Sequence, residues 1–271
     1  MRGSSRIAFS TSLRRDMRNL ARFRLRDGTD RGVAGALAYK TAELTLRALR
    51  DYHRHELIGL ENLPKEGPAL IVCNHSFATY DGWLIGVAIK DELGRSAAAI
   101  GDRLMMRSPV VGALFRHLGF IEGSRGAAVE ILRRGEILGV VPGGMREGLR
   151  SSKDKYRIDW RGRTGFVRAS MLSGAPIVLA ACPRADDIFD VADLAFTRRI
   201  YERFKVPVAM VRGFGPTLVP RPIKLWHLLS EPIRPPVPPD RVTEETVLAH
   251  HAFLTERMGR LMNDALAMKP S

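Results

Sequence analysis

The sequence of 271 residues contains only two cysteines, and none of its apolar runs approaches the roughly 20 residues that a membrane-spanning helix needs. Its first residues also lack the apolar core of a secretory signal peptide. Cys73 and Cys182 each end a short apolar run, where we expect buried, reduced thiols. These absences predict a cytoplasmic protein that does not cross a membrane.

Acidic residues are scarce relative to basic ones, at 29 against 43, which gives a formal net charge of +14. A field of this sign attracts anionic surfaces, either nucleic acid or phospholipid headgroups. Because 45% of the residues are hydrophobic and 27% are charged, a disordered or collagen-like chain is excluded. The composition is that of a globular protein with a sizeable core.

Residues 1–30 differ from the rest of the chain, with eight Arg against three Asp. One helical face of this segment is apolar, and it carries Phe9, Leu13, Met17 and Leu20. Such a helix either lies in the headgroup layer of an anionic membrane or packs on the protein body with its basic side in solvent. A disordered tail is a third possibility. We therefore divide the chain into a basic helical extension, residues 1–55, and a domain of residues 56–271.

Short apolar runs alternate with helical patterns along most of the chain. The runs predict strands at residues 69–73, 97–100, 120–121, 137–141, 176–181, 206–211 and 223–229. Helices are expected at residues 33–52, 81–90, 108–119, 126–135, 164–173, 184–204 and 243–268. The alternation predicts an α/β fold, in which helices flank a central, largely parallel or mixed sheet behind an amphipathic N-terminal extension.

His75 stands out among the seven histidines, of which we expect the other six to be exposed or hydrogen-bonded polar residues. It directly follows the buried strand predicted at residues 69–73, at the sheet edge where α/β folds bind ligands. Asp81 opens the next predicted helix. Its carboxylate, folded back over the loop, would hold one ring nitrogen and leave the other free to take a proton from an alcohol.

A second candidate motif, Pro-Gly-Gly-Met-Arg-Glu at residues 142–147, also follows an apolar strand directly. Gly143 and Gly144 allow the backbone to approach a ligand closely, and Arg146 offers several donors to an anion or a carbonyl oxygen. The alternative interpretation is a tight turn with an exposed Arg. A nucleotide phosphate loop is excluded, because Leu149 follows Gly148 where that motif requires Lys.

Taken in order, these motifs resemble the glycerolipid acyltransferase superfamily, which includes the lysophospholipid and glycerol-phosphate acyltransferases. The resemblance runs from about residue 57 to residue 233. Its four blocks are Asn-His with the following Asp at residues 74–81, Gly-Phe-Ile-Glu-Gly-Ser-Arg at 119–125, Pro-Gly-Gly-Met-Arg-Glu at 142–147 and Gly-Ala-Pro-Ile-Val at 174–178. Four blocks in order are more specific than any one alone.

Two blocks depart from the usual family pattern. Five residues separate His75 from Asp81, where the family has four, so the loop is one residue longer. In the usual block P-E-G-T-R, Gly143 here replaces the Glu and Met145 replaces the Thr, while Arg146 matches the Arg. Both departures are similar to the diacylglycerol-acyltransferase-like branch, whose acceptors are often uncharged alcohols.

The resemblance implies an O-acyltransferase whose donor is acyl-CoA or an acyl carrier protein thioester and whose acceptor is a lipid hydroxyl, with no cofactor and no metal. It implies that His75 is the general base and that Asp81 fixes its tautomer. The implied substrate-binding residues are Arg125, Gly143, Gly144, Arg146 and Glu147. The enzyme would work peripherally on an anionic membrane, at the inner face.

Alternatives remain open at this point. The acceptor could be lysophosphatidate, or the chain could be a non-catalytic lipid- or nucleic-acid-binding protein, although the basic N-terminus has few interleaved aromatics and we expect no nucleic acid. A serine hydrolase lacks support because no Gly-x-Ser-x-Gly elbow is present. Zinc catalysis also lacks support, since His53 and His55 do not have the i, i+4 spacing of a zinc-binding helix.

Overall fold

The computed structural model describes residues 32–101, 106, 112, 115, 120–123, 126–194, 196, 199, 203 and 209–268. It forms two compact units, one of residues 1–45 and 101–122 and a larger one of residues 46–100 and 123–271. The basic segment predicted as a helix at residues 1–30 lies outside the described residues, as does most of the helix predicted at 108–119.

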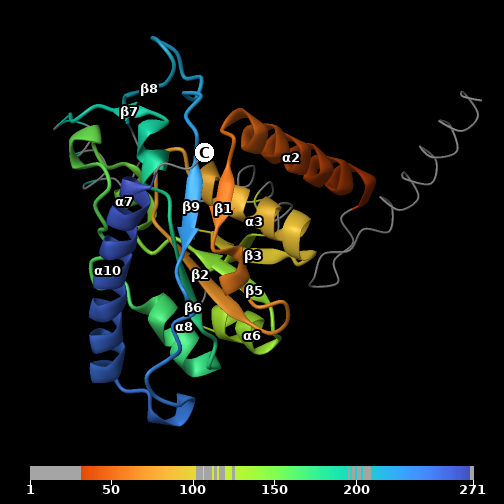
Figure 1. Ribbon diagram of the computed structural model, residues 1–271, viewed down its shortest axis with the longest axis vertical. Helices are drawn as coiled ribbons and strands as arrows, with labels where there is room; N and C mark the ends of the chain where they lie inside the picture. The colour runs from red at the N-terminus through yellow and green to blue at the C-terminus, as the bar shows by residue number, and fades with distance from the viewer. Residues whose placement is uncertain are drawn as a thin grey trace, which may run out of the picture. The chain divides into compact units, whose positions relative to one another are not determined.

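The larger unit contains six of the seven strands of the main sheet (Figure 1). Their order across it is β1 (Glu56–Ile58), β9 (Trp226–Leu229), β6 (Ile177–Ala181), β2 (Ala69–Cys73), β5 (Ile137–Val140) and β3 (Ala97–Gly101). All neighbouring pairs are parallel except β6 and β9. The predicted α/β fold with a largely parallel sheet is therefore confirmed. The seventh strand, β4 (Phe120–Glu122), belongs to the smaller unit.

The other elements are helices and a two-stranded ribbon. The α-helices are α2 (Gly32–Tyr52), α3 (Tyr80–Leu93), α6 (Ala127–Arg133), α7 (Gly144–Gly148), α8 (Gly165–Ser173) and α10 (Glu244–Ala267). The 3-10 helices are η1 (Leu60–Asn62), η2 (Ser152–Asp154), η3 (Pro183–Asp187) and η4 (Pro239–Arg241), and the antiparallel ribbon pairs β7 (Asp190–Val191) with β8 (Val211–Arg212). None of the described helices is long and apolar enough to cross a bilayer.

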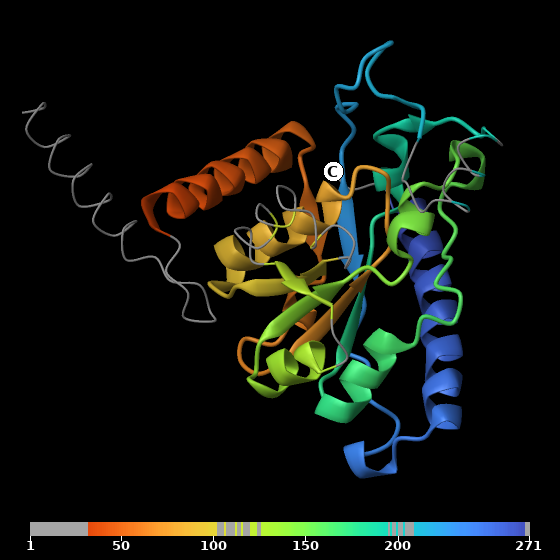
Figure 2. The same ribbon diagram turned by 180° about the vertical axis from the view of Figure 1, so that it is seen from behind.

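Helices cover both faces of the sheet (Figures 1 and 2). On one face, Ile85 and Ile89 of α3 pack against Ile71 and Cys73 of β2. Alternate strand residues point to the opposite face, which α6, α8 and α10 cover. Burial on both sides explains why the sequence of β2 is a continuous apolar run. Cys73 and Cys182 are buried and form no disulfide, as predicted.

The helix predicted from residue 184 to residue 204 is borne out only in part: residues 196, 199 and 203 are helical, but no α-helix forms over residues 184–194. The chain instead makes η3 and then β7. Ion pairs explain the difference, because Arg150 binds Asp186 and Lys155 binds Asp187, which holds these carboxylates toward an earlier part of the chain. Tertiary contacts here override a local helical pattern.

The strand order reverses at the centre of the sheet. The chain passes from β2 over β5 to β3, and later from β5 back over β2 to β6, so β2 and β5 flank the switch point at which α/β folds bind ligands. Val72 pairs with Val140 across these two strands, and His75 and Gly143 each lie three residues beyond that pair. The sheet therefore brings the two predicted motifs to the same edge.

Candidate functional site

Asn74 fixes the start of the loop that carries His75. Its buried side chain accepts a hydrogen bond from the backbone N–H of Cys182 at 2.8 Å and donates one to the carbonyl oxygen of Cys182 at 3.2 Å. This pair of bonds ties the end of β2 to the end of β6. Asn74 is a supporting residue that sequence reasoning did not single out.

The imidazole of His75 is held by the backbone of the next residue. Its Nδ1 lies 2.8 Å from the carbonyl oxygen of Ser76, which can only accept, so Nδ1 carries the proton and Nε2 has a free lone pair. No described residue hydrogen-bonds to Nε2. Burial lowers the pKa of His75, with the positive charge of Arg150 adding to the effect, so the ring is neutral near pH 7. This is the protonation state of a general base.

The predicted hydrogen bond between His75 and Asp81 is not formed. Asp81 instead accepts a hydrogen bond at 2.7 Å from the hydroxyl of Ser76. The longer loop explains this, because it turns at Thr79, whose φ is 61°, and the Thr79 N–H donates to the Ser76 hydroxyl. Ser76 therefore stands between the two predicted catalytic residues, with its carbonyl on the imidazole and its hydroxyl on the carboxylate.

Asp81 shares a buried polar cluster with His227 and Cys182, whose ligand atoms lie within 4.8 Å of one another. His227 in turn contacts His55, with 2.8 Å between His55 Nε2 and His227 Nδ1. Burial raises the pKa of Asp81 to about 6, lowers that of His227 to about 3 and raises that of Cys182. A metal ion would need the thiol of Cys182 deprotonated, whereas the direction of all three pKa shifts favours the uncharged forms of these side chains. Both histidines were expected to be exposed or hydrogen-bonded, and the structure shows them buried and hydrogen-bonded to each other.

The two glycines after β5 lead directly into α7 and leave room for other side chains. A Cβ at Gly143 would overlap the carboxylate of Glu147, and a Cβ at Gly144, whose φ is 54°, would overlap the guanidinium of Arg163. Gly148 lies against the catalytic candidate, since a Cβ there would come within 2.8 Å of Cε1 of His75. The glycines of this motif therefore shape the site through close packing.

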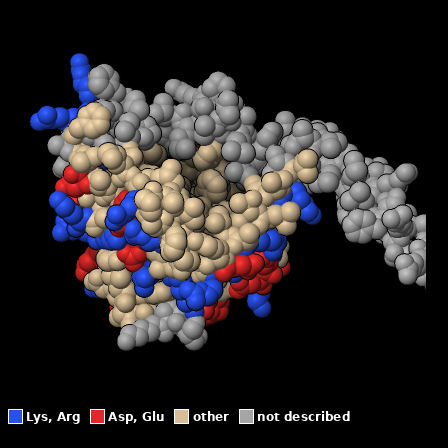
Figure 3. Space-filling model, turned by 90° about the horizontal axis from the view of Figure 1, so that it is seen from above, with Lys and Arg blue, Asp and Glu red and all other residues tan. Residues whose placement is uncertain are grey.

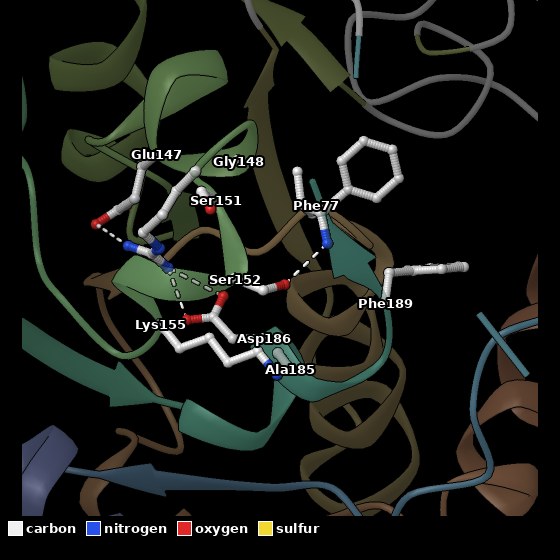
Figure 4. Close-up of a pocket in the computed structure, with 11 residues that line it drawn as sticks. Phe77, Glu147, Gly148, Ser151, Ser152, Lys155, Ala185, Asp186 and Phe189 are labelled. Carbon is white, nitrogen blue, oxygen red and sulfur yellow. Dashed lines mark hydrogen bonds and ion pairs between the residues drawn. The ribbon is translucent and has the colours of Figure 1, made fainter. Parts of the chain in front are cut away.

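A group that we call the charged clamp, formed by Glu147, Arg150 and Asp186, holds the main chain of His75. Figure 4 labels Glu147 and Asp186 and marks the ion pairs of the clamp with dashed lines. Glu147 accepts the backbone N–H of His75 at 3.1 Å, and Arg150 donates to the His75 carbonyl oxygen at 3.2 Å. Both oxygens of Asp186 bind Arg150, at 2.8 and 2.9 Å. The clamp thus grips both polar groups of the His75 backbone with buried charged side chains.

Glu147 is the most perturbed member of the clamp. Burial raises its pKa to about 7, although the N–H of Asp159 at 3.0 Å, Arg150 and the N–H of His75 all favour the charged form. Its carboxylate also fills the space that a side chain at position 143 would need. Glu147, predicted from the sequence to bind substrate, lines the pocket described below, and its carboxylate also binds two backbone N–H groups and Arg150.

A known protein family matches nearly half of the chain. The family model described as Acyltransferase matches residues 54–182. A protein named "DGAT1/2-independent enzyme synthesizing storage lipids" is 30% identical over 222 residues in Bos taurus, which is 79% of this chain and 64% of the relative. The protein of the same name in Homo sapiens is also 30% identical over 222 residues, with 79% and 66% covered. Residues 54–182 thus match the Acyltransferase family, and these relatives extend the likeness over 79% of the chain.

A solved structure supports the same fold. The 1-acyl-sn-glycerophosphate (LPA) acyltransferase PlsC of Thermotoga maritima aligns with a TM-score of 0.53 and 18% identity, over 86% of this chain and 81% of that one. At this identity the likeness concerns the fold. The chain spans less than two thirds of the bovine and human relatives, so the activity of the whole protein is a matter for proposal.

The basic residues expected to bind substrate lie in different surroundings. Arg125 lies outside the described residues. Arg146 is half-exposed, and its Nε lies 3.7 Å from a carboxylate oxygen of Asp159. Arg163, which the sequence did not suggest, packs over the Gly-Gly turn and donates to the carbonyl oxygen of Pro142 at 3.0 Å. No carboxylate of the described residues forms an ion pair with Arg163, so its charge is available to an anionic group.

A pocket opens beside the clamp (Figure 4). Its lining residues are Phe77, Glu147, Gly148, Arg150, Ser151, Ser152, Lys155, Ala185, Asp186, Phe189 and Val191. Phe77 and Phe189 form an apolar side opposite the clamp, with ring centroids 5.6 Å apart. Gly148, which packs against the imidazole of His75, also lines this pocket, so apolar and polar surfaces meet near the site.

Proposed function

We propose that this acyltransferase moves a fatty acyl group from acyl-CoA or an acyl carrier protein to the hydroxyl of a glycerolipid or another lipid alcohol. The observation that carries the proposal is the state of His75, which is neutral, protonated on Nδ1 and free on Nε2 at the switch point of the sheet. The family supports acyl transfer as the reaction class. No resident cofactor takes part in this scheme.

In the proposed reaction, Nε2 of His75 takes the proton of the acceptor hydroxyl while its oxygen attacks the thioester carbonyl. The tetrahedral intermediate then expels the thiolate, which takes the proton back from the imidazolium. A base of this kind contributes about 10²–10⁴ in rate. Ser76 and the charged clamp fix the position of the ring, and Asp81 acts through Ser76 as a positioning residue.

An uncharged acceptor such as diacylglycerol fits the third block best. Gly143 and Met145 replace the two polar residues of the usual family motif, and the space near position 143 is filled by Glu147, which faces the backbone. The name of the bovine and human relatives points to storage lipids and so to the same acceptor class. These features favour the diacylglycerol-acyltransferase-like branch.

Lysophosphatidate is the second candidate acceptor, and one observation favours it. The guanidinium of Arg163 lies over the Gly-Gly turn without a carboxylate partner among the described residues, where it could bind a phosphate. We further propose that the protein works peripherally on the inner face of a membrane, because its acceptor is a lipid.

The test is an acyl-transfer assay on the full chain, with radiolabelled acyl-CoA and vesicles that contain one acceptor at a time. Diacylglycerol, monoacylglycerol, lysophosphatidate and a long-chain alcohol form the panel. We expect wild-type protein to acylate diacylglycerol and His75→Ala to lose at least about a hundredfold in rate while keeping its fold. Circular dichroism checks the fold.

Preference for lysophosphatidate would reassign the acceptor to the second candidate. Transfer by His75→Ala at the rate of the wild type would reject His75 as the base. If the folded wild-type protein transferred the acyl group to no alcohol, with either thioester donor, the proposed function itself would be wrong.

A further inference from the structure

The residues on either side of β8 expose an unusual group of apolar side chains. Met210, Phe214, Leu218 and Val219 are 61%, 62%, 69% and 53% exposed. We call residues 210–219 the apolar tip. In both ribbon views this light-blue turn projects beyond the rest of the larger unit (Figures 1 and 2). A cluster of exposed apolar side chains on a projecting turn is typical of an interaction surface.

The apolar tip is held in shape by its own hydrogen bonds. Gly213 N–H donates to the carbonyl oxygen of Thr217, and Phe214 N–H donates to that of Val219, both at 2.7 Å. The Thr217 hydroxyl donates to the carbonyl oxygen of Phe214 at 2.7 Å. Phe214, Leu218 and Val219 are therefore presented by a closed turn whose inner polar groups are satisfied, and exposure is a property of its shape.

The base of the apolar tip is joined to the wall of the pocket. Arg221 donates from Nη1 to Asp190 at 3.0 Å and from Nε to the carbonyl oxygen of Gly213 at 3.1 Å. Gly213 packs so closely on Phe189 that a Cβ there would come within 3.2 Å of the ring. Phe189 in turn contacts Phe77 across the apolar side of the pocket. A continuous set of contacts thus links the tip to the loop of His75.

Charge does not explain what the tip would bind. Basic and acidic side chains lie side by side on the face seen from above, with uncharged surface between the groups (Figure 3). Arg212, within the tip, is paired with Asp190 at 3.3 Å. Because exposed pairs of this kind contribute little, the exposed apolar side chains dominate the chemistry of the tip.

We propose that the apolar tip inserts into the headgroup layer of a phospholipid surface and places the pocket beside His75 at that surface. The inference rests on the proposed transfer to a lipid acceptor. A lipid layer fits the tip because it accepts a narrow group of apolar side chains without a matching groove, and Arg212 remains at headgroup level. Contact through Phe189 then places the apolar side of the pocket near the acceptor.

The test compares two double variants of the full chain in sedimentation with vesicles of phosphatidylcholine and phosphatidylglycerol. The tip variant is Phe214→Ser with Leu218→Ser. The control variant removes the same two residue types from the exposed side of α10, Phe253→Ser with Leu248→Ser, which are 44% and 50% exposed. Thermal unfolding of both variants checks that they fold like the wild type.

We expect the tip variant to bind vesicles at least about tenfold more weakly than the wild type, and the control variant to bind within about twofold. In a Phe214→Trp variant, brominated lipid in the vesicles should quench the fluorescence of the introduced tryptophan. This quenching would show directly that the tip is inserted. Equal vesicle binding by the tip variant and the wild type would overturn the proposal, whether residues 1–30 or another surface provides the binding.

Acyl transfer separates this proposal from the proposed function. The tip variant should acylate a diacylglycerol in vesicles about tenfold more slowly, yet acylate a water-soluble short-chain alcohol acceptor within about twofold of the wild-type rate. An equal loss on both acceptors would overturn the role of the tip in docking. Absence of transfer by the wild type would reject the proposed function, while the binding comparison would still decide whether the tip docks on lipid.

Discussion

Glu147→Gln is the variant that most sharply tests the charged clamp. The carboxylate accepts the backbone N–H groups of His75 and Asp159, at 3.1 and 3.0 Å. Each oxygen of Glu147 keeps an acceptor lone pair even when the carboxyl is protonated, whereas glutamine has only one oxygen and its NH₂ group must face one of these donors. An unsatisfied buried donor costs about 1–3 kcal/mol, and we expect a loss of this size in the free energy of unfolding at about pH 5.

The pH dependence of that loss has a defined sign. Burial raises the pKa of Glu147 from 4.5 to about 7, so the contribution of this residue to stability is fully present below its unfolded value and is lost as pH rises through 7. At about 1.36 kcal/mol for each pKa unit, the wild type loses about 2–3 kcal/mol from Glu147 between about pH 5 and pH 8. The Gln variant has no such loss.

Urea unfolding at several pH values measures both effects. The stability gap between wild type and Glu147→Gln should narrow or reverse as pH rises, and kcat for acyl transfer should fall more than KM changes, because the backbone of His75 is displaced. Glu256→Gln is the control, since Glu256 is exposed on α10 and forms only a surface pair with Arg260. Parallel stability profiles of wild type and Glu147→Gln would refute the reasoning.

Four further predictions concern the site. Gly148→Ala should displace the ring of His75 and lower kcat at least about tenfold, whereas Gly165→Ala, which has open space, should leave kcat unchanged in the same assay. Arg163→Met should weaken acylation of lysophosphatidate about tenfold or more relative to diacylglycerol, and equal effects on both in competition assays would remove Arg163 from acceptor binding. Asp81→Asn keeps an acceptor for Ser76, so we expect transfer to slow by less than about tenfold, and a loss as large as that of His75→Ala would show that the charge itself is needed. In a pH–rate profile, the midpoint of the acid limb of kcat/KM should lie below pH 6.5, because burial lowers the pKa of His75. A midpoint above pH 6.5 would contradict a buried position for the catalytic imidazole.

Elements with strong local signals could be predicted from the sequence. The apolar run of β2 is buried on both faces, and its bounds match the prediction because Gly67 and Pro68 precede it. The long helix α10 was found for the same kind of reason, since Thr243 caps it through a capping box with Thr246. Periodicity and caps are local properties, so one sequence suffices to recognise them.

The contacts that fix the site could not be predicted in the same way. Arg150 and Asp186 are 36 residues apart, and nothing in the local sequence shows that Asp186 binds Arg150, which in turn donates to the carbonyl oxygen of His75. The five-residue helix α7 is too short for a periodic pattern, so the motif there was expected to be a ligand loop or a tight turn.

The relation of His75 to Asp81 illustrates a further limit. Their spacing indicated a direct hydrogen bond, but the longer loop lets Ser76 bind both residues. Which atom of a loop faces an imidazole depends on backbone dihedral angles such as the positive φ of Thr79. Residue types and spacing alone do not determine those angles.

The tautomer of His75 is the property on which the proposed chemistry depends. Nitrogen NMR of protein labelled with ¹⁵N-histidine measures it near neutral pH, and the signals absent from His75→Ala identify the residue. We expect a protonated Nδ1 and a bare Nε2, since Nδ1 donates to the Ser76 carbonyl oxygen. A protonated Nε2 with a bare Nδ1 would leave no proton acceptor for the alcohol and would contradict the account.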